Sequence, residues 1–266
     1  MQILFRKSFD AEGELAIAKE YCDVKELRSE CGVDTTIIGR YSVLPYYKEL
    51  SNDLWHKRSK LINNYEQHSW IADFEYYNVG AIQAFTFPTF DEYTFHAAPQ
   101  GAYVVKGRTN SRKHQWNTHM FAPNKAAASH IAAELMNESL IGSQGIIYRK
   151  YIPLETFEVG INGLPFTNEW RFFFLGETLL TCGYYWSQAE LADTYVVSPD
   201  AIQFARHIAK QVKLHANFFV LDVAKTESGD WILVEINDGQ MSGLCMCEPR
   251  QLYNGLKNEY SNIRSV

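Results

Sequence analysis

Two neighbouring segments constrain the fold of this chain more than any other feature, because together they predict a β-hairpin. Residues 218–224 (FFVLDVA) and 231–237 (WILVEIN) are both rich in β-branched and aromatic side chains, which favour strands. The residues between them, ESGD at 227–230, are typical of a turn. We therefore expect two antiparallel strands, whose register decides which polar side chains meet.

The predicted register brings three oxygen-bearing side chains together. With the turn centred between Ser228 and Gly229, Asp222 lies directly opposite Glu235, and Asn237 points to the same face. Opposed side chains in an antiparallel pair have Cβ atoms about 4.5–5.5 Å apart. Two carboxylates so placed repel each other unless a cation lies between them, and magnesium prefers carboxylate and amide oxygens. We predict a Mg²⁺ site here; the alternative is the solvated outer face of an ordinary hairpin.

Composition indicates a globular protein. The 266 residues are 46% hydrophobic and 21% charged, which excludes a disordered chain. The net charge of −6 disfavours nucleic acid as a partner, so any polyanion must be bound locally. Five cysteines without CxxC spacing favour reduced thiols, and the sequence has neither a membrane-spanning apolar run nor the layout of a signal peptide. We expect a cytoplasmic protein without membrane contact.

The chain divides into a short and a long region. Alternating strand and helix patterns over residues 1–92 predict a small α/β domain, and proline with turn formers at residues 87–94 indicates a boundary. The expected helices are residues 12–21, 46–55, 125–137 and 199–215, and the expected strands besides the hairpin are residues 2–9, 36–45 (running into a turn), 102–106, 145–152, 169–175 and 178–186.

Charged residues follow one another along the chain in a characteristic order. A strand lysine, Lys106, precedes a strand that ends in YRKYIPL at residues 148–154, and Glu-Trp-Arg follows at 169–171. The acidic hairpin at residues 222–237 comes last. Over about residues 96–245 this order resembles the ATP-grasp superfamily.

The resemblance implies an α+β fold. An ATP-grasp domain over residues 93–266 would consist of two α+β subdomains that grip ATP, a small one at 93–150 and a metal-bearing one at 151–266. The small α/β N-terminal domain at 1–92 would precede it. ATP and Mg²⁺ are the cofactors implied.

The resemblance also implies a set of nucleotide ligands. Lys106 would contact the phosphates, and Lys113 would close over them; plain solvation of Lys113 is the alternative. Glu169 would take the ribose hydroxyls, with Glu155 as the other candidate. The linker that meets adenine through its backbone would be Arg149, Lys150, Tyr151 and Ile152.

The same resemblance implies the reaction. Arg171 would stabilise the transferring phosphate, and Asp222, Glu235 and Asn237 would hold Mg²⁺. ATP would phosphorylate a carboxylate, and an amine would displace phosphate from the acyl phosphate to give an amide or peptide-like bond. The alternatives are a kinase-like phosphotransferase and a nucleotide-binding regulator without turnover, although the intact acidic triad counts against the latter.

The substrate would be a small molecule or peptide that carries carboxylate and amine groups. Arg40 and Tyr41, in the loop at residues 39–47, are candidates to grip a substrate carboxylate. A tyrosine-packed turn before a helix is the alternative for that loop. The glycine-bearing segment 238–244 and the aromatic run 184–186 are further candidates to line the cleft.

Overall fold

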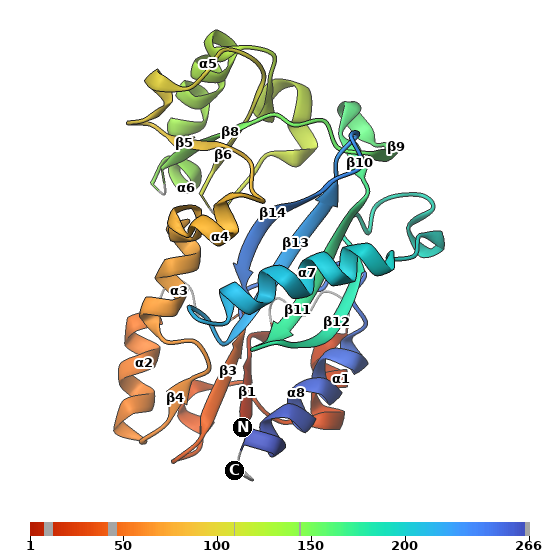
Figure 1. Cartoon of the computed structure of the whole chain (residues 1–266). Helices are drawn as coiled ribbons and strands as arrows, with labels where there is room; N and C mark the ends of the chain where they lie inside the picture. The colour runs from red at the N-terminus through yellow and green to blue at the C-terminus, as the bar shows by residue number, and fades with distance from the viewer. Residues whose placement is uncertain (8–12, 42–46, 109, 144, 264–266) are drawn as a thin grey trace.

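Four β-sheets with surrounding helices build the part of the chain that the computed structural model describes, residues 1–7, 13–41, 47–108, 110–143 and 145–263. Figure 1 shows a small subdomain at the top, a central sheet below it, and the N-terminal sheet at the bottom. The mixed helix and sheet architecture predicted from the sequence is confirmed. In that part of the chain no helix is both long and apolar enough to cross a membrane.

The central sheet is antiparallel and places most of the predicted site. Alternation along its strands separates two cores: Phe172 and Phe174 pack beneath helix α7 (Pro199–Val212), whereas Phe173 packs towards the N-terminal sheet. Arg171 shares the face of Phe173 because it lies two residues away. The strands, in the order β12-β11-β13-β14, are Thr178–Tyr184, Glu169–Leu175, Phe218–Lys225 and Trp231–Asp238.

The acidic hairpin has the predicted pair but an unpredicted register near its turn. Asp222 is directly opposite Glu235, as expected, yet Lys225 is opposite Trp231, which centres the turn on Ser228. A shift between Asp222 and Val223 reconciles the two, because the next pair is Val223 with Leu233. A β-bulge that inserts one residue in β14 produces this offset and keeps the acidic pair aligned.

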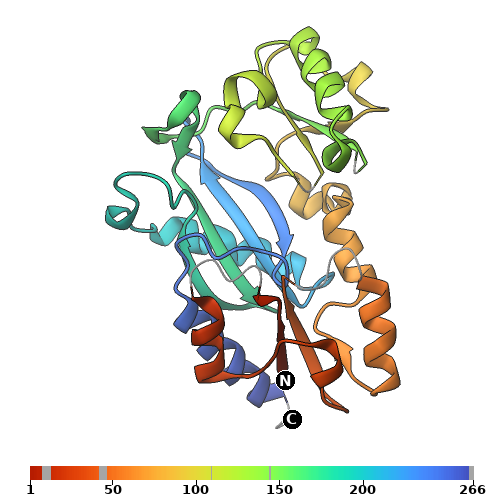
Figure 2. The same cartoon turned by 180° about the vertical axis from the view of Figure 1, so that it is seen from behind.

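The N-terminal sheet is parallel and packs on the central sheet through helices α1 (Glu14–Tyr21) and α8 (Pro249–Ile263), which lie side by side in Figure 2. Helix α2 (Tyr47–His56) covers the other face, where Leu50 and Leu54 are buried as their spacing predicted. The predicted strand at 2–9 and helix at 12–21 extend into residues outside the described ranges, as does the loop at 42–46. The strands, in the order β2-β1-β3-β4, are Asp23–Lys25, Gln2–Phe5, Thr36–Arg40 and Lys60–Leu61.

The small subdomain is an antiparallel sheet covered by helix α5 (Lys125–Met136). Asn124 caps this helix by accepting a hydrogen bond from the backbone of Ala127 at 2.9 Å. Strand β5 lies ahead of the boundary expected at residue 92 and pairs with β8. The strands, in the order β5-β8-β6-β7, are Thr89–Asp91, Ile146–Lys150, Tyr103–Gly107 and Phe121–Ala122, and α6 is Ser139–Gly142.

Short elements connect these layers. Helix α3 (Tyr65–Ala72) begins after Asn64, whose side chain accepts a hydrogen bond from Gln67 N at 2.8 Å, and it packs beside β14. The remaining elements are helix α4 (Gly80–Gln83) and the antiparallel pair β9 (Thr156–Val159) and β10 (Pro165–Thr167).

Candidate active site

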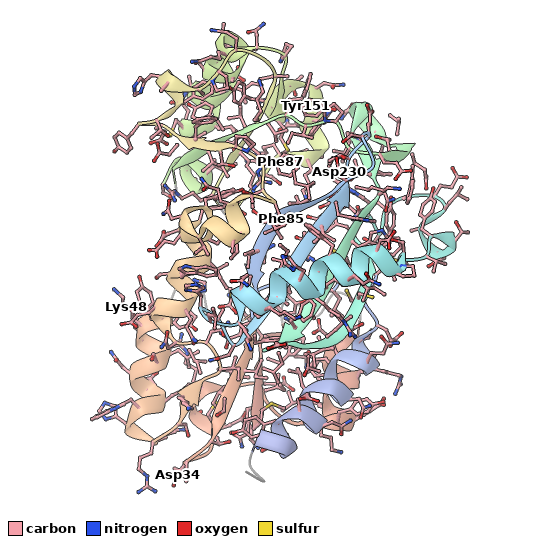
Figure 3. All side chains as sticks on the ribbon, viewed as in Figure 1. Asp34, Lys48, Phe85, Phe87, Tyr151 and Asp230 are labelled. Atoms are coloured by element: carbon pink, nitrogen blue, oxygen red, sulfur yellow. The ribbon has the colours of Figure 1, made fainter. Side chains whose placement is uncertain are left out.

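Two cavities adjoin where the small subdomain, the central sheet and the N-terminal region meet. The first cavity lies against the linker that follows β8, and the second extends from it along the end of β14 towards α3. Figure 3 labels Phe87 and Tyr151, two residues of the first cavity, at the junction of the small subdomain and the central sheet. The residues shared by the two walls are Lys106, Ser111, Lys113, Tyr185 and Glu235.

The inner part of the first cavity is apolar and follows the predicted linker. All four linker residues, 149–152, line it. The backbone N–H groups of Lys150 and Tyr151 donate to Pro88 O at 2.8 Å and to Ala102 O at 2.9 Å. Among the described residues the N–H of Ile152 donates no hydrogen bond, so it is the linker donor that a flat heterocycle can use. Apolar residues that line the same space include Phe87, Val104, Trp116, Met120, Leu154 and Val234.

A cation and an anion meet where the cavities join. Lys106 Nζ donates to Glu235 Oε1 at 2.6 Å, and both side chains are largely buried. Burial raises the pKa of Glu235, but the charges of Lys106 and Arg149 outweigh it and bring that pKa to about 2. Burial lowers the pKa of Lys106, and the Glu235 charge offsets only part of this shift. Glu235 is therefore ionised at every pH at which the protein would work.

Arg149 adds a second buried cation, although its predicted role involved only its backbone. The strand alternation in β8 turns its side chain into the first cavity, where Nη2 donates to the hydroxyl of Tyr77 at 3.2 Å. Its Nε is buried and has no hydrogen-bond partner among the described residues. A buried guanidinium with an unused donor is suited to an anionic ligand, since an unpaired buried polar group is costly.

Lys113 stands over the entrance between the cavities. Its ammonium lies 4.2 Å from the ring centroid of Tyr185 and 5.1 Å from that of Trp186, and it also donates to the Tyr185 hydroxyl. These aromatic contacts hold the cation without neutralising it. Of the aromatic run predicted to line the cleft, Tyr185 and Trp186 do so, whereas Tyr184 is buried in the core under α7.

Arg171 and Asp222 form a buried, two-pronged ion pair. Arg171 Nε donates to Asp222 Oδ1 and Nη2 donates to Oδ2, each at 2.8 Å, while Nη1 donates to Gly243 O at 2.7 Å. Asp222 is only 1% exposed and lines neither cavity, whereas Arg171 lines the second cavity. Asp222 thus fixes the orientation of a guanidinium that faces the second cavity.

The three predicted metal ligands are assembled on one face. Asn237 Nδ2 donates to Asp222 Oδ2 at 3.1 Å, which leaves the amide oxygen of Asn237 as its acceptor, and both Glu235 and Asn237 line the second cavity. Asp222 retains a lone pair on Oδ1 beyond the one that Arg171 uses. No group of three or more His, Cys, Asp or Glu side chains gathers within the described ranges. Two carboxylates and one amide are hard oxygen donors that fit Mg²⁺.

Glu169 lies on the wall of the first cavity with an unusual carboxyl group. Thr167 Oγ1 donates to its Oε2 at 3.1 Å, and the nearby charges are those of Lys113 and Asp222. Burial raises the pKa of Glu169 to about 7 against the opposing effect of Lys113. The alternative ribose ligand, Glu155, does not line the cavity and instead accepts a hydrogen bond from Asn168 at 2.8 Å.

Glu169→Gln is expected to stabilise the protein at alkaline pH. Ionising the buried carboxyl opposes folding, so the contribution of Glu169 is most favourable below its unfolded pKa of about 4.5 and is lost as the pH rises through about 7. Relative to the parent, the free energy of unfolding of the variant should rise by about 3 kcal/mol between these limits and level off above them. Urea unfolding at several pH values measures the difference; a difference independent of pH would contradict it.

The two predicted substrate residues of the N-terminal loop have different surroundings. Arg40 is fully buried; its Nε and Nη2 donate to Glu14 Oε1 at 3.0 and 2.8 Å. It also donates to Gly239 O, so it joins β3 to the segment after β14 and lines neither cavity. This placement does not support a substrate role for Arg40. Tyr41 lines the second cavity, where its hydroxyl donates to Glu14 Oε2 at 2.9 Å.

Three features of the site were missed in the sequence. The side chains of Tyr77 and Arg149 meet across 72 residues, and His68 meets Asp238 across 170 residues. The alternation of β8 could have indicated the inward side chain of Arg149, because Ile147 and Arg149 flank Tyr148 on the opposite face. No local pattern marks His68.

Comparisons with known proteins agree on the family. A family model described as an ATP-grasp domain, the third family of its clade, matches residues 95–256. A search of curated protein sequences found no match. Similar solved structures include a RimK domain ATP-grasp protein from Sphaerobacter thermophilus (12% identity, TM-score 0.59, covering 97% of this chain and 98% of that one). The macrocyclase MdnC from Microcystis aeruginosa, bound to precursor peptide MdnA, has 11% identity and a TM-score of 0.57 over 98% and 100%.

A third similar structure is a RiPP-associated ATP-grasp ligase from Chryseobacterium gregarium in complex with ADP and a leader and core peptide. It has 12% identity and a TM-score of 0.57, and the match covers 98% of this chain and 97% of that one. At these identities the similarity concerns the fold.

Proposed function

The chain belongs to the ATP-grasp family, and from this premise we propose that it is an ATP-dependent ligase. It would join a carboxylate to an amine through an acyl phosphate, with Mg²⁺ required. The observation that carries the proposal is the shared wall of the two cavities, in which Lys106, Lys113 and Glu235 face both. A triphosphate from the first cavity and a carboxylate in the second would meet at that wall.

The first cavity suits ATP. Its apolar walls and the backbone N–H of Ile152 would take the adenine, and Glu169 would accept hydrogen bonds from the ribose. Lys106, Lys113 and Arg149 supply three positive charges along the path from there to Glu235. Cations so placed stabilise the charge that a transferring phosphoryl group spreads over its oxygens.

The second cavity suits the acceptor. Arg171, held by Asp222, would orient the carboxylate and stabilise its oxygen as it takes the phosphoryl group. Asp222, Glu235 and Asn237 would hold Mg²⁺, which when bound neutralises charge on the β- and γ-phosphates. An amine would then attack the acyl carbon and release phosphate. Peptide-bound relatives of the same fold support a peptide, or a small molecule with similar groups, as substrate.

Lys113→Met is expected to weaken ATP binding by about 10- to 100-fold, because a hydrogen bond to a charged group contributes roughly 1.5–3 kcal/mol. The fold should persist, since Lys113 is partly exposed and its contacts are with aromatic rings. Calorimetric titration with ATP and Mg²⁺ measures this. Lys210→Met, on the exposed face of α7, is the matched control and should bind ATP as the parent does.

The reaction can be tested without knowing the amine. The protein is incubated with ATP, Mg²⁺ and hydroxylamine, together with pooled amino acids and dipeptides as carboxylate donors. A ligase of the proposed kind releases ADP and phosphate and traps the acyl phosphate as a hydroxamate. A phosphorylated product that resists hydroxylamine would show the kinase-like alternative, and bound ATP that stays intact would show a regulator. Either result would refute the proposal.

A further inference from the structure

A histidine and an aspartate meet in the wall of the second cavity, outside the groups described so far. His68 on α3 and Asp238 at the end of β14 both line that cavity, and His68 Nδ1 lies 3.0 Å from Asp238 Oδ2. Both side chains are largely buried. The side-chain contacts of His68 within the described residues are with Asp238 and Tyr47, and with none of the three proposed metal ligands. The pair therefore belongs to the substrate side of the site.

The hydrogen bonds around Asp238 decide which nitrogen of His68 carries the proton. Asp238 Oδ1 accepts from Asn63 Nδ2 and from Gln240 N, each at 2.9 Å. An ionised carboxylate can only accept, so the short contact with His68 requires the proton on Nδ1. Nε2 then keeps its lone pair, and no hydrogen bond to it occurs among the described residues. An imidazole with this tautomer can accept a proton at Nε2.

The imidazole ring is also fixed in position. Tyr47 stacks on it with a centroid distance of 4.7 Å and an interplanar angle of 21°. The Tyr47 hydroxyl in turn donates to the backbone oxygen of Asn63 and accepts from Gln240 Nε2 at 3.2 Å. The ring is thus held on one face by stacking and at one edge by a carboxylate, as a proton acceptor that must meet a substrate should be.

The other groups in the second cavity do not suit this task. Glu235, with its pKa of about 2, is a weak base, and burial raises the pKa of Tyr185 well above its usual value, so that it stays protonated. The Tyr41 hydroxyl donates its hydrogen bond to Glu14. The remaining charged residues of the wall are cations: Arg6, Lys106, Arg108, Lys113 and Arg171. His68 is the neutral base that lines this cavity in the described part of the chain.

We propose that His68 is the general base for the second half of the reaction, accepting at Nε2 a proton from the attacking amine. This inference rests on the proposed ligase function. An ammonium substrate loses one proton to solvent; its nitrogen then forms the C–N bond as the acyl carbon–oxygen bond breaks, and that electron pair leaves with the phosphate. His68 takes the second proton during attack and returns it to the departing phosphate, which is released as HPO₄²⁻.

The test separates the amine step from acyl phosphate formation. Asparagine at position 68 keeps an N–H donor for Asp238 but has no acceptor where Nε2 was. With a donor found by hydroxamate formation, His68→Asn should form the hydroxamate within about threefold of the parent rate, because hydroxylamine is neutral and reactive at neutral pH. Ligation to the amines of the same pool should fall by about 100-fold or more, the usual contribution of a general base. His96→Asn, at an exposed histidine outside both cavities, should change neither rate.

The opposite results are equally specific. If His68→Asn loses both reactions equally, the histidine is structural, and if it loses neither, it has no role; both overturn the inference and leave the ligase proposal standing. If the parent forms no hydroxamate with any donor, the ligase proposal fails and the base role fails with it. Diethyl pyrocarbonate, which acylates accessible neutral imidazole, gives a readout that needs no substrate: peptide mapping should find it on His68, and an unmodified His68 would overturn the inference.

Discussion

Glu235→Gln is expected to lower ATP-dependent turnover by about two to three orders of magnitude, a loss of roughly 3–4 kcal/mol of transition-state stabilisation. The substitution keeps the size of the side chain and removes the negative charge that faces both cavities. It has two effects on charge. One of the two carboxylates proposed to hold Mg²⁺ is lost, and Lys106 loses its partner at 2.6 Å, which lowers the pKa of that buried ammonium further.

The measurement is ADP release in the presence of hydroxylamine, at several Mg²⁺ concentrations. Glu177→Gln, in an exposed ion pair with Lys213, is the matched control and should retain parental turnover. Circular dichroism and the unfolding midpoint verify that the Glu235→Gln protein is folded. Turnover within threefold of the parent at every Mg²⁺ concentration would remove Glu235 from the proposed site.

Arg171→Met is expected to cost about 3–5 kcal/mol of the free energy of unfolding, because it leaves the carboxylate of Asp222 buried without a counter-ion. Asp222 is 1% exposed, and Arg171 supplies two of its hydrogen bonds. The same change should abolish turnover, since the guanidinium that faces the second cavity is gone. Urea unfolding compares the variant with Arg58→Met, which breaks an ion pair whose side chains are 77% and 57% exposed and should cost at most about 1 kcal/mol.

A double variant distinguishes lost pairing from lost packing. Asp222→Asn removes the charge that Arg171→Met exposes, so Arg171→Met with Asp222→Asn should be more stable than Arg171→Met alone. Both proteins should be inactive. If the double variant instead shows the simple sum of two losses, the instability comes from the shape of the side chains and not from an unpaired buried charge.

The sequence predicted the parts of the fold that depend on local patterns. The strand at Glu169–Leu175 has the predicted bounds, and the pairing of Asp222 with Glu235 follows from two regular strands. The bulge in β14 was not predictable from alternation, because one inserted residue changes the register without changing the hydrophobic character of the segment. The acidic pair nevertheless survived, since the turn is offset by the one residue that the bulge restores.

The parts that failed or were missed depend on contacts between distant residues. Arg40 resembles a surface cation in a loop, but Glu14, Gly239 and Tyr41 surround it once β3 packs against the end of the hairpin. His68 lies in a helix of ordinary sequence, and only the packing of that helix beside β14 brings it to Asp238. Charge partners and tautomers of this kind arise from tertiary structure, to which the sequence pattern gives no access.

The account depends on a divalent cation held by one face of the acidic hairpin beside the ATP phosphates. A crystal of the protein grown with Mn²⁺ and a non-hydrolysable ATP analogue tests this directly, because manganese gives an anomalous signal that locates it. We expect the adenine at the linker near Ile152 and the manganese peak between the terminal phosphates and the oxygens of Asp222, Glu235 and Asn237. A peak away from these three side chains, or a nucleotide bound outside the first cavity, would contradict the account.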